Sequence, residues 1–146
     1  MKLIWYFVAL VSGAFLPIQA GLNSKLGKSI ENPVYASMIS FAIGFFSLLA
    51  FILLTKQSVT WAGVKSVPVY VWASGVLGAF YVTAVILTYP QIGPALTFGL
   101  VVAGQMIISV LMDHFHILVH IKHSINIYRL IGVAFIVAGV IIIRKF

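Results

Sequence analysis

The chain has 146 residues, of which 62% are hydrophobic and only 8% are charged. A soluble domain carries charge on about a quarter of its residues, so this composition excludes a water-soluble globular protein and predicts an integral membrane protein. The net charge is +7 and cysteine is absent, which excludes disulfides and thiolate metal sites. The basic residues lie between apolar runs, where they set topology and meet membrane lipids, and they do not indicate a nucleic-acid partner.

The apolar runs predict a single all-α transmembrane domain, residues 1–146, built as a helical bundle of about five spans. The charge-free stretch 66–112 is too long for one span, and Pro90, Gly93 and Pro94 are predicted to divide it. The last apolar run, 130–143, is short for a hydrocarbon core of about 30 Å, so a re-entrant helix is an alternative there. The predicted spans are about 3–21, 33–54, 67–89, 94–112 and 126–143.

The first segment also has the outline of a secretory signal peptide. Lys2 precedes an apolar run, and Ile18-Gln19-Ala20 before Gly21 is an acceptable cleavage site. The four apolar segments that follow favour a retained first span that serves as its own insertion signal, and cleavage stays the alternative.

The basic residues are almost equally divided between the two faces of the membrane. The face of the N-terminus carries five, and the opposite face carries four: Lys2, Lys56, Lys65, Lys122 and Arg129 against Lys25, Lys28, Arg144 and Lys145. A single orientation usually requires an excess on one face. The balance therefore predicts either dual topology, with an inverted (antiparallel) homodimer, or a heterodimer with a similar inverted chain.

Polar residues within the spans are neutral, because no acidic residue lies near the middle of any span. In the first span Gln19 and Asn23 share a helix face. In the fourth span Gln105 begins a stripe with Ser109 and Asp113 at spacings of four residues. A stripe of small residues, Ala95, Gly99 and Ala103, is predicted roughly opposite that polar face, where it would let helices approach closely. Whether Gln105 contributes to a ligand site or to a hydrogen bond between helices stays open.

The histidines between the fourth and fifth spans, His114, His116, His120 and His123, raise the question of a metal site. Their apolar neighbours favour an amphipathic loop at the lipid headgroups, and no metal is predicted. No catalytic or phosphate-binding motif is visible, so the sequence predicts neither an enzyme nor a cofactor.

Four stretches carry a family resemblance: LPIQAGLNSKLGKSIENPVYASMISFAIGFFSLL, SGVLGAFYVT, PQIGPALTFGLVVAGQMIISVLMDHF and RLIGVAFIVAGVIIIR. They resemble the YdcZ-like small inner-membrane proteins of bacteria, within the drug/metabolite transporter (DMT) superfamily. The resemblance implies about five spans per chain, with members found singly, as adjacent gene pairs or fused in tandem. This sequence has His116 where the family usually has glycine after Asp-His-Phe, and it lacks the membrane-buried glutamate of the small multidrug resistance proteins.

The sequence and the resemblance together predict a small-molecule transporter in the bacterial inner membrane, working as an inverted pair. The substrate would be bound through hydrogen bonds by Gln19, Asn23, Tyr81 and Gln105. Pro17 would act as a helix hinge, and Asp113 is the candidate for ion coupling. A dual-topology channel and a non-transporting membrane partner subunit are the alternatives.

Overall fold

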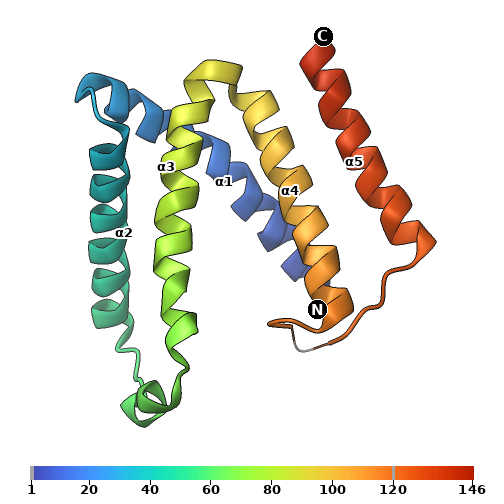
Figure 1. Cartoon of the computed structure of the whole chain (residues 1–146). Helices are drawn as coiled ribbons and strands as arrows, with labels where there is room; N and C mark the ends of the chain where they lie inside the picture. The colour runs from blue at the N-terminus through green and yellow to red at the C-terminus, as the bar shows by residue number, and fades with distance from the viewer. Residues whose placement is uncertain (1, 120) are drawn as a thin grey trace. The chain divides into compact units, whose positions relative to one another are not determined.

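The computed structural model describes residues 2–119 and 121–146, and all regular structure within these ranges is helical. Figure 1 shows the five α-helices of the described residues, α1 (Lys2–Ser29), α2 (Pro33–Thr55), α3 (Ser74–Ile92), α4 (Pro94–Phe115) and α5 (Ile127–Lys145). Two short 3₁₀ helices, η1 (Trp61–Ser66) and η2 (Val69–Ala73), precede α3. Five helical segments of the described chain are long and apolar enough to cross a membrane. The predicted all-α architecture with five candidate spans is confirmed.

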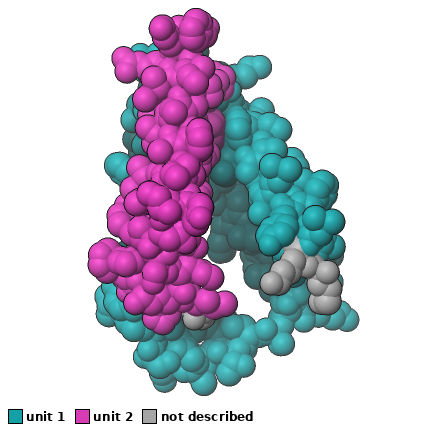
Figure 2. All heavy atoms as spheres, turned by 90° about the vertical axis from the view of Figure 1, so that its right-hand side faces the viewer, with its two compact units in different colours: residues 1–91 teal, residues 92–146 magenta. Residues whose placement is uncertain are grey.

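The chain divides into two compact units, unit 1 (residues 1–91) and unit 2 (residues 92–146), which Figure 2 colours separately. The division falls where Pro90, Gly93 and Pro94 were predicted to separate two spans. The helix does not break at Pro90, however: α3 continues to Ile92, and Gly93 alone leaves the helical conformation with a φ of 79°. Only glycine adopts such a backbone readily, and Pro94 then starts α4 with a fixed, helix-compatible φ.

The first helix is longer than the predicted first span. It continues through Pro17 and past Gly21 to Ser29, a length of 28 residues, or about 42 Å at 1.5 Å per residue. Pro17 removes one backbone hydrogen bond, the one to the carbonyl of Gly13, but it does not end the helix. The helix ends eight residues after Gly21 because Glu31 takes a left-handed conformation (φ 54°).

The turn between α1 and α2 is held by backbone and side-chain hydrogen bonds. The N–H of Asn32 donates to the carbonyl of Gly27 and that of Glu31 to Lys28, the pattern of a Schellman motif. The Asn32 side chain then accepts from the N–H groups of Val34 and Tyr35 and caps α2. This compact connection makes α1 and α2 sequential neighbours in unit 1.

The third α-helix begins at Ser74, seven residues after the predicted start at Val67. Pro68 supplies no N–H and its neighbours form the 3₁₀ helix η2 instead. Helical structure therefore runs from Val69 to Ile92, and this combined segment is long enough to span.

Close contacts in unit 1 depend on small residues. A β-carbon on Gly27 of α1 would lie 3.3 Å from the Cα of Pro33 and 3.3 Å from Cγ2 of Ile86, so α2 and α3 both approach this glycine. Further along, the Thr83 hydroxyl of α3 donates to the Ser37 hydroxyl of α2 at 2.8 Å. Unit 1 is thus joined by close packing at one place and by a hydrogen bond between helices at another.

Unit 2 is an antiparallel pair of helices, α4 and α5. A β-carbon on Gly99 would lie only 3.0 Å from Cγ2 of Val140, so the start of α4 lies against the end of α5. Ala103 and Val110 of α4 are buried further along the helix. The small residues Gly99 and Ala103 therefore allow the close approach that the sequence predicted.

The surface of the molecule is dominated by large apolar side chains. Leu54 is 83% exposed and Phe80 is 73% exposed, whereas no large side chain of the described residues is fully buried. A soluble protein rarely exposes apolar surface on this scale. These exposed apolar side chains are suited to the hydrocarbon core of a bilayer.

Candidate functional site

Two polar regions interrupt the apolar helices, one in each unit. The first lies on α1 around Asn23. This residue is only 8% exposed, yet its side chain makes no hydrogen bond with another described residue of unit 1. Gln19, one turn earlier, is exposed. No side-chain nitrogen or oxygen of the described residues is both fully buried and unpaired, so the Asn23 amide keeps some accessible surface. Its hydrogen-bonding capacity is therefore available to a ligand or another chain.

Tyr89 of α3 lies against the same stretch of α1. A β-carbon on Gly21 would be 3.0 Å from the Tyr89 hydroxyl oxygen, so any larger residue at position 21 would displace that hydroxyl. Sequence reasoning missed Tyr89. The signal that could have found it is the glycine between Gln19 and Asn23, since a glycine inside a helix often marks a close approach.

Tyr81 is half-buried in α3, two residues before Thr83. The Thr83 hydroxyl is already used, because it donates to Ser37, and the Ser37 hydroxyl donates in turn to the carbonyl of Pro33. This chain of hydrogen bonds joins helices and leaves little capacity for a ligand. No hydrogen bond joins Tyr81 to Gln19 or Asn23 within residues 2–91.

The second polar region closes the loop between α4 and α5. Arg129 Nη1 donates to Asp113 Oδ2 at 3.0 Å and to the carbonyl of His123 at 3.2 Å. The N–H of His123 donates to the carbonyl of Asp113, and the N–H of Ile125 donates to His114 Nδ1. The sequence singled out Asp113 but not its partner. The sequence signal that could have indicated this partner is the pair of opposite charges, Asp113 and Arg129, at the two ends of one loop.

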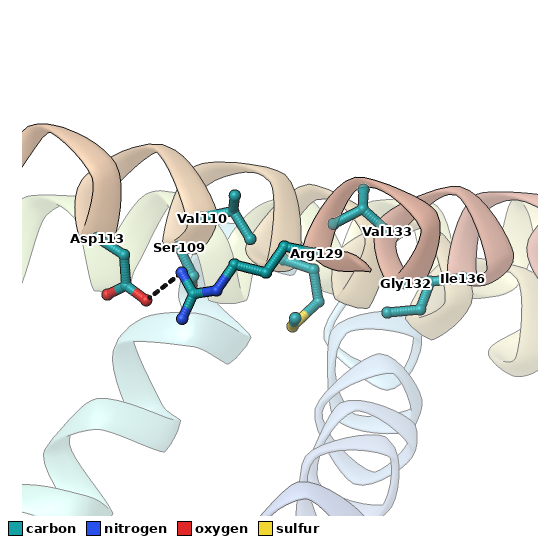
Figure 3. A pocket seen from close by; sticks show the side chains of 8 residues that line it. Ser109, Val110, Asp113, Arg129, Gly132, Val133 and Ile136 are labelled. Atoms are coloured by element: carbon teal, nitrogen blue, oxygen red, sulfur yellow. Dashed lines mark hydrogen bonds and ion pairs between the residues drawn. The ribbon is translucent and has the colours of Figure 1, made fainter. Parts of the chain in front are cut away.

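Beside this ion pair is a cavity of about 290 Å³ between α4 and α5. Figure 3 shows the Arg129 side chain reaching from α5 to Asp113 on α4, with apolar side chains further along both helices. The pair lies at the polar end of the cavity, and both side chains are 29% exposed. The cavity is lined by Met106, Ser109, Val110, Asp113, Arg129, Gly132, Val133 and Ile136.

The predicted polar stripe of α4 does not stay on one face. Ser109 and Asp113 line the cavity toward α5, whereas Gln105 is exposed and does not line it. Residues spaced by four advance about 40° around a helix at each step, because a turn has 3.6 residues. The prediction that the small-residue stripe lies opposite the polar stripe is therefore wrong at Asp113, which faces α5 as Gly99 does.

The candidate substrate residues are divided between the units. Gln19, Asn23 and Tyr81 belong to unit 1, and Gln105 and Asp113 belong to unit 2. Their joint role in substrate binding stays a prediction. Among the described residues no three histidine or acidic side chains gather as a metal ion would require, and His120 of the loop lies outside those residues.

The family described as "Putative inner membrane exporter, YdcZ" matches residues 4–142, nearly the whole chain. The chain belongs to this family. It is 28% identical over 125 residues to the inner membrane protein YdcZ of Escherichia coli (strain K12), an alignment covering 84% of this chain and 80% of that protein. No solved structure matches the chain. Membership in the YdcZ family, together with five candidate spans, makes this a multi-pass inner-membrane protein with a transporter-like role.

Proposed function

We propose that the chain is one half of a small-molecule transporter of the DMT superfamily, working as an inverted pair in the inner membrane. The observation that carries the proposal is its match to an inner-membrane exporter family over residues 4–142. Five spans put the two ends of a chain on opposite faces of the membrane, so a partner of opposite orientation supplies an inverted repeat. The balance of five basic residues against four fits either a second copy or a similar chain as that partner.

Substrate would be held by neutral hydrogen-bonding side chains, with Asn23 of α1 at the centre. Asn23 as a whole is 8% exposed and its amide has no side-chain partner among the described residues of unit 1, so a ligand group can pair with the amide without displacing an existing bond. Gln19 lies one turn away on α1, and Tyr81 and Gln105 would contribute from α3 and α4. A site of this kind selects polar, uncharged or weakly charged groups.

Pro17 and Asp113 would serve the movement between states. Pro17 leaves the carbonyl of Gly13 without its helical partner, and a β-carbon on Gly13 would meet nothing within 4 Å. α1 can therefore bend here at low cost. Asp113 would couple transport to an ion by releasing Arg129, the residue with which it is paired in this structure.

Transport can be tested with the purified chain in sealed vesicles, screened against a panel of metabolites and cationic dyes, with and without the chain encoded by any similar neighbouring gene. We expect at least one solute to move faster than in empty vesicles. For that solute, Asn23→Ala is expected to weaken apparent affinity about tenfold, because an unpaired group in a buried site costs about 1–3 kcal/mol. Gln57→Ala is the matched control, since Gln57 is an exposed amide in the loop after α2.

Two results would overturn the proposal. Single-channel currents across a planar bilayer would identify a pore, because carriers do not reach channel rates. No flux of any solute, with either partner arrangement, would identify a non-transporting subunit.

A further inference from the structure

The ion pair of unit 2 has an unusual electrostatic setting. Asp113 lies in the last turns of α4, at the negative end of the helix dipole, and Arg129 lies in the first turn of α5, at the positive end. Both placements are unfavourable for the charge concerned. Asp113 is also the only acidic residue of 92–146, whereas Lys122 adds a second positive charge to the same loop. The region as a whole therefore attracts anions more strongly than cations.

The Arg129 guanidinium has hydrogen-bond donors that are not used within the described residues of unit 2. A guanidinium carries five N–H groups in a planar fork, but Nη1 alone makes both of its side-chain hydrogen bonds, to Asp113 and to the carbonyl of His123. Nε and Nη2 make none within residues 92–119 and 121–146. An anion that displaced Asp113 would leave the arginine still anchored by His123. A phosphate or carboxylate fits such a fork through two parallel bonds.

Apart from Ser109, the rest of the cavity lining is apolar. Val110 of α4 and Val133 and Ile136 of α5 continue from the ion pair along the two helices, as Figure 3 shows. Met106 of α4 also lines the cavity. The volume of about 290 Å³ is just below the range of drug-sized ligand sites, which hold about 300–1,000 Å³. It suits the head and the first part of an alkyl chain rather than a bulky ring system.

We propose that this cavity binds an amphipathic anion, with Arg129 holding its phosphate or carboxylate head and the α4–α5 walls holding the start of its apolar tail. A membrane phospholipid and a free amphipathic acid share this chemistry. The site lies within unit 2 and does not depend on transport, so failure of the vesicle experiment above would leave it standing.

Binding of decyl phosphate can be measured by titration calorimetry on the full-length protein in phosphatidylcholine nanodiscs, with empty nanodiscs as the blank. We expect saturable binding, at least about tenfold tighter than that of inorganic phosphate, which lacks the tail. Arg129→Gln should weaken it about tenfold or more, and Arg129→Lys should also weaken it, since lysine lacks the fork. Arg144→Gln, at the other end of α5, is the control and should bind as the unchanged chain does.

Asp113→Asn tests whether the cavity prefers an anionic or a cationic ligand. Removing the competing carboxylate should tighten binding of decyl phosphate, because Arg129 becomes free. If Asp113→Asn instead abolishes binding, or if decyltrimethylammonium binds more tightly than decyl phosphate, the site prefers cations and the proposal is wrong.

A second variant tests the cavity without touching the ion pair. A β-carbon on Gly132 meets nothing within 4 Å, so Gly132→Leu can fill the cavity without a clash at that atom. We expect it to lose decyl phosphate binding while remaining folded, as judged by circular dichroism. Gly139→Leu is the matched control, because Gly139 is equally open but does not line the cavity. Unchanged binding by Gly132→Leu would overturn the proposal.

The lipid composition of the nanodiscs distinguishes a bound phospholipid from a free amphipathic acid as the source of the anion. If phosphatidylglycerol is the ligand, nanodiscs of that lipid will weaken decyl phosphate binding by competition, and Asp113→Asn will strengthen the competition. Equal binding in phosphatidylglycerol and phosphatidylcholine assigns the site to a free amphipathic acid. Absence of binding in both, for the unchanged chain and for Asp113→Asn, would overturn the site itself.

Discussion

At the scale of single residues, His116 ends α4 in a conformation that suits glycine better. Its φ is 57°, and its N–H and that of Ile117 both donate to the carbonyl of Met112. The family resemblance implies glycine at this position, and in this chain histidine takes a left-handed conformation that glycine adopts readily. Histidine tolerates this region better than most residues but still pays a steric cost of about 1 kcal/mol.

We therefore expect His116→Gly to raise the free energy of unfolding by about 0.5–1 kcal/mol, because the left-handed strain is removed. The measurement is denaturation in mixed detergent micelles followed by circular dichroism. His123→Gly is the control: His123 contributes backbone bonds at an ordinary φ, so glycine there should lower stability. A loss of stability in His116→Gly would show that the histidine ring matters more than the strain.

At the scale of the helices, the pairing of α4 with α5 depends on Gly99. Val140 occupies the space that a side chain at position 99 would need, with 3.0 Å to a β-carbon there. Gly104 of the same helix has no neighbour within 4 Å of such an atom. Two glycines five residues apart thus have different structural roles.

Gly99→Val is expected to destabilise the protein by about 1–3 kcal/mol, because α5 must move away or Val140 must leave its rotamer. Gly104→Val should change stability by less than about 0.5 kcal/mol. The same denaturation assay compares them. Equal effects of the two substitutions would mean that α4 and α5 are not packed through Gly99.

Much of this organisation could be predicted from sequence, because a long apolar run leaves a membrane helix few alternatives. The helix ends were less predictable. Pro17 and Pro90 read as interruptions but lie inside helices, since one lost hydrogen bond does not outweigh the rest of a helix. The pair of Asp113 and Arg129 was missed because sequence does not show how a loop closes. Asn23 was predicted as a site residue on its spacing alone, and only the structure shows that the residue is largely buried while its amide is unpaired among the described residues.

At the scale of the whole molecule, the balance of basic residues leads to a prediction about orientation. The chain contains no cysteine, so single cysteines can be introduced without a background signal. Lys25 and Lys65 are both exposed and are predicted on opposite faces of the membrane.

Lys25→Cys and Lys65→Cys should each react partially with a membrane-impermeant maleimide from either side in intact cells and inverted vesicles. That result is expected because neither orientation has a clear charge advantage. Complete labelling from one side, with the two cysteines on opposite sides, would exclude the self-inverted homodimer and leave the inverted partner chain.

The length of α1 also fixes the depth at which its polar residues meet the bilayer. The helix measures about 42 Å against a hydrocarbon core of about 30 Å, so one end must leave the core. Lys25 and Lys28 place the C-terminal end of α1 outside the core, because their ammonium groups need water or headgroups. Asn23 is two residues before Lys25, or about 3 Å along the axis. Its amide is therefore near the boundary between the hydrocarbon core and the headgroups. A solute bound by Asn23 would contact the protein near the membrane surface and not at the bilayer midplane.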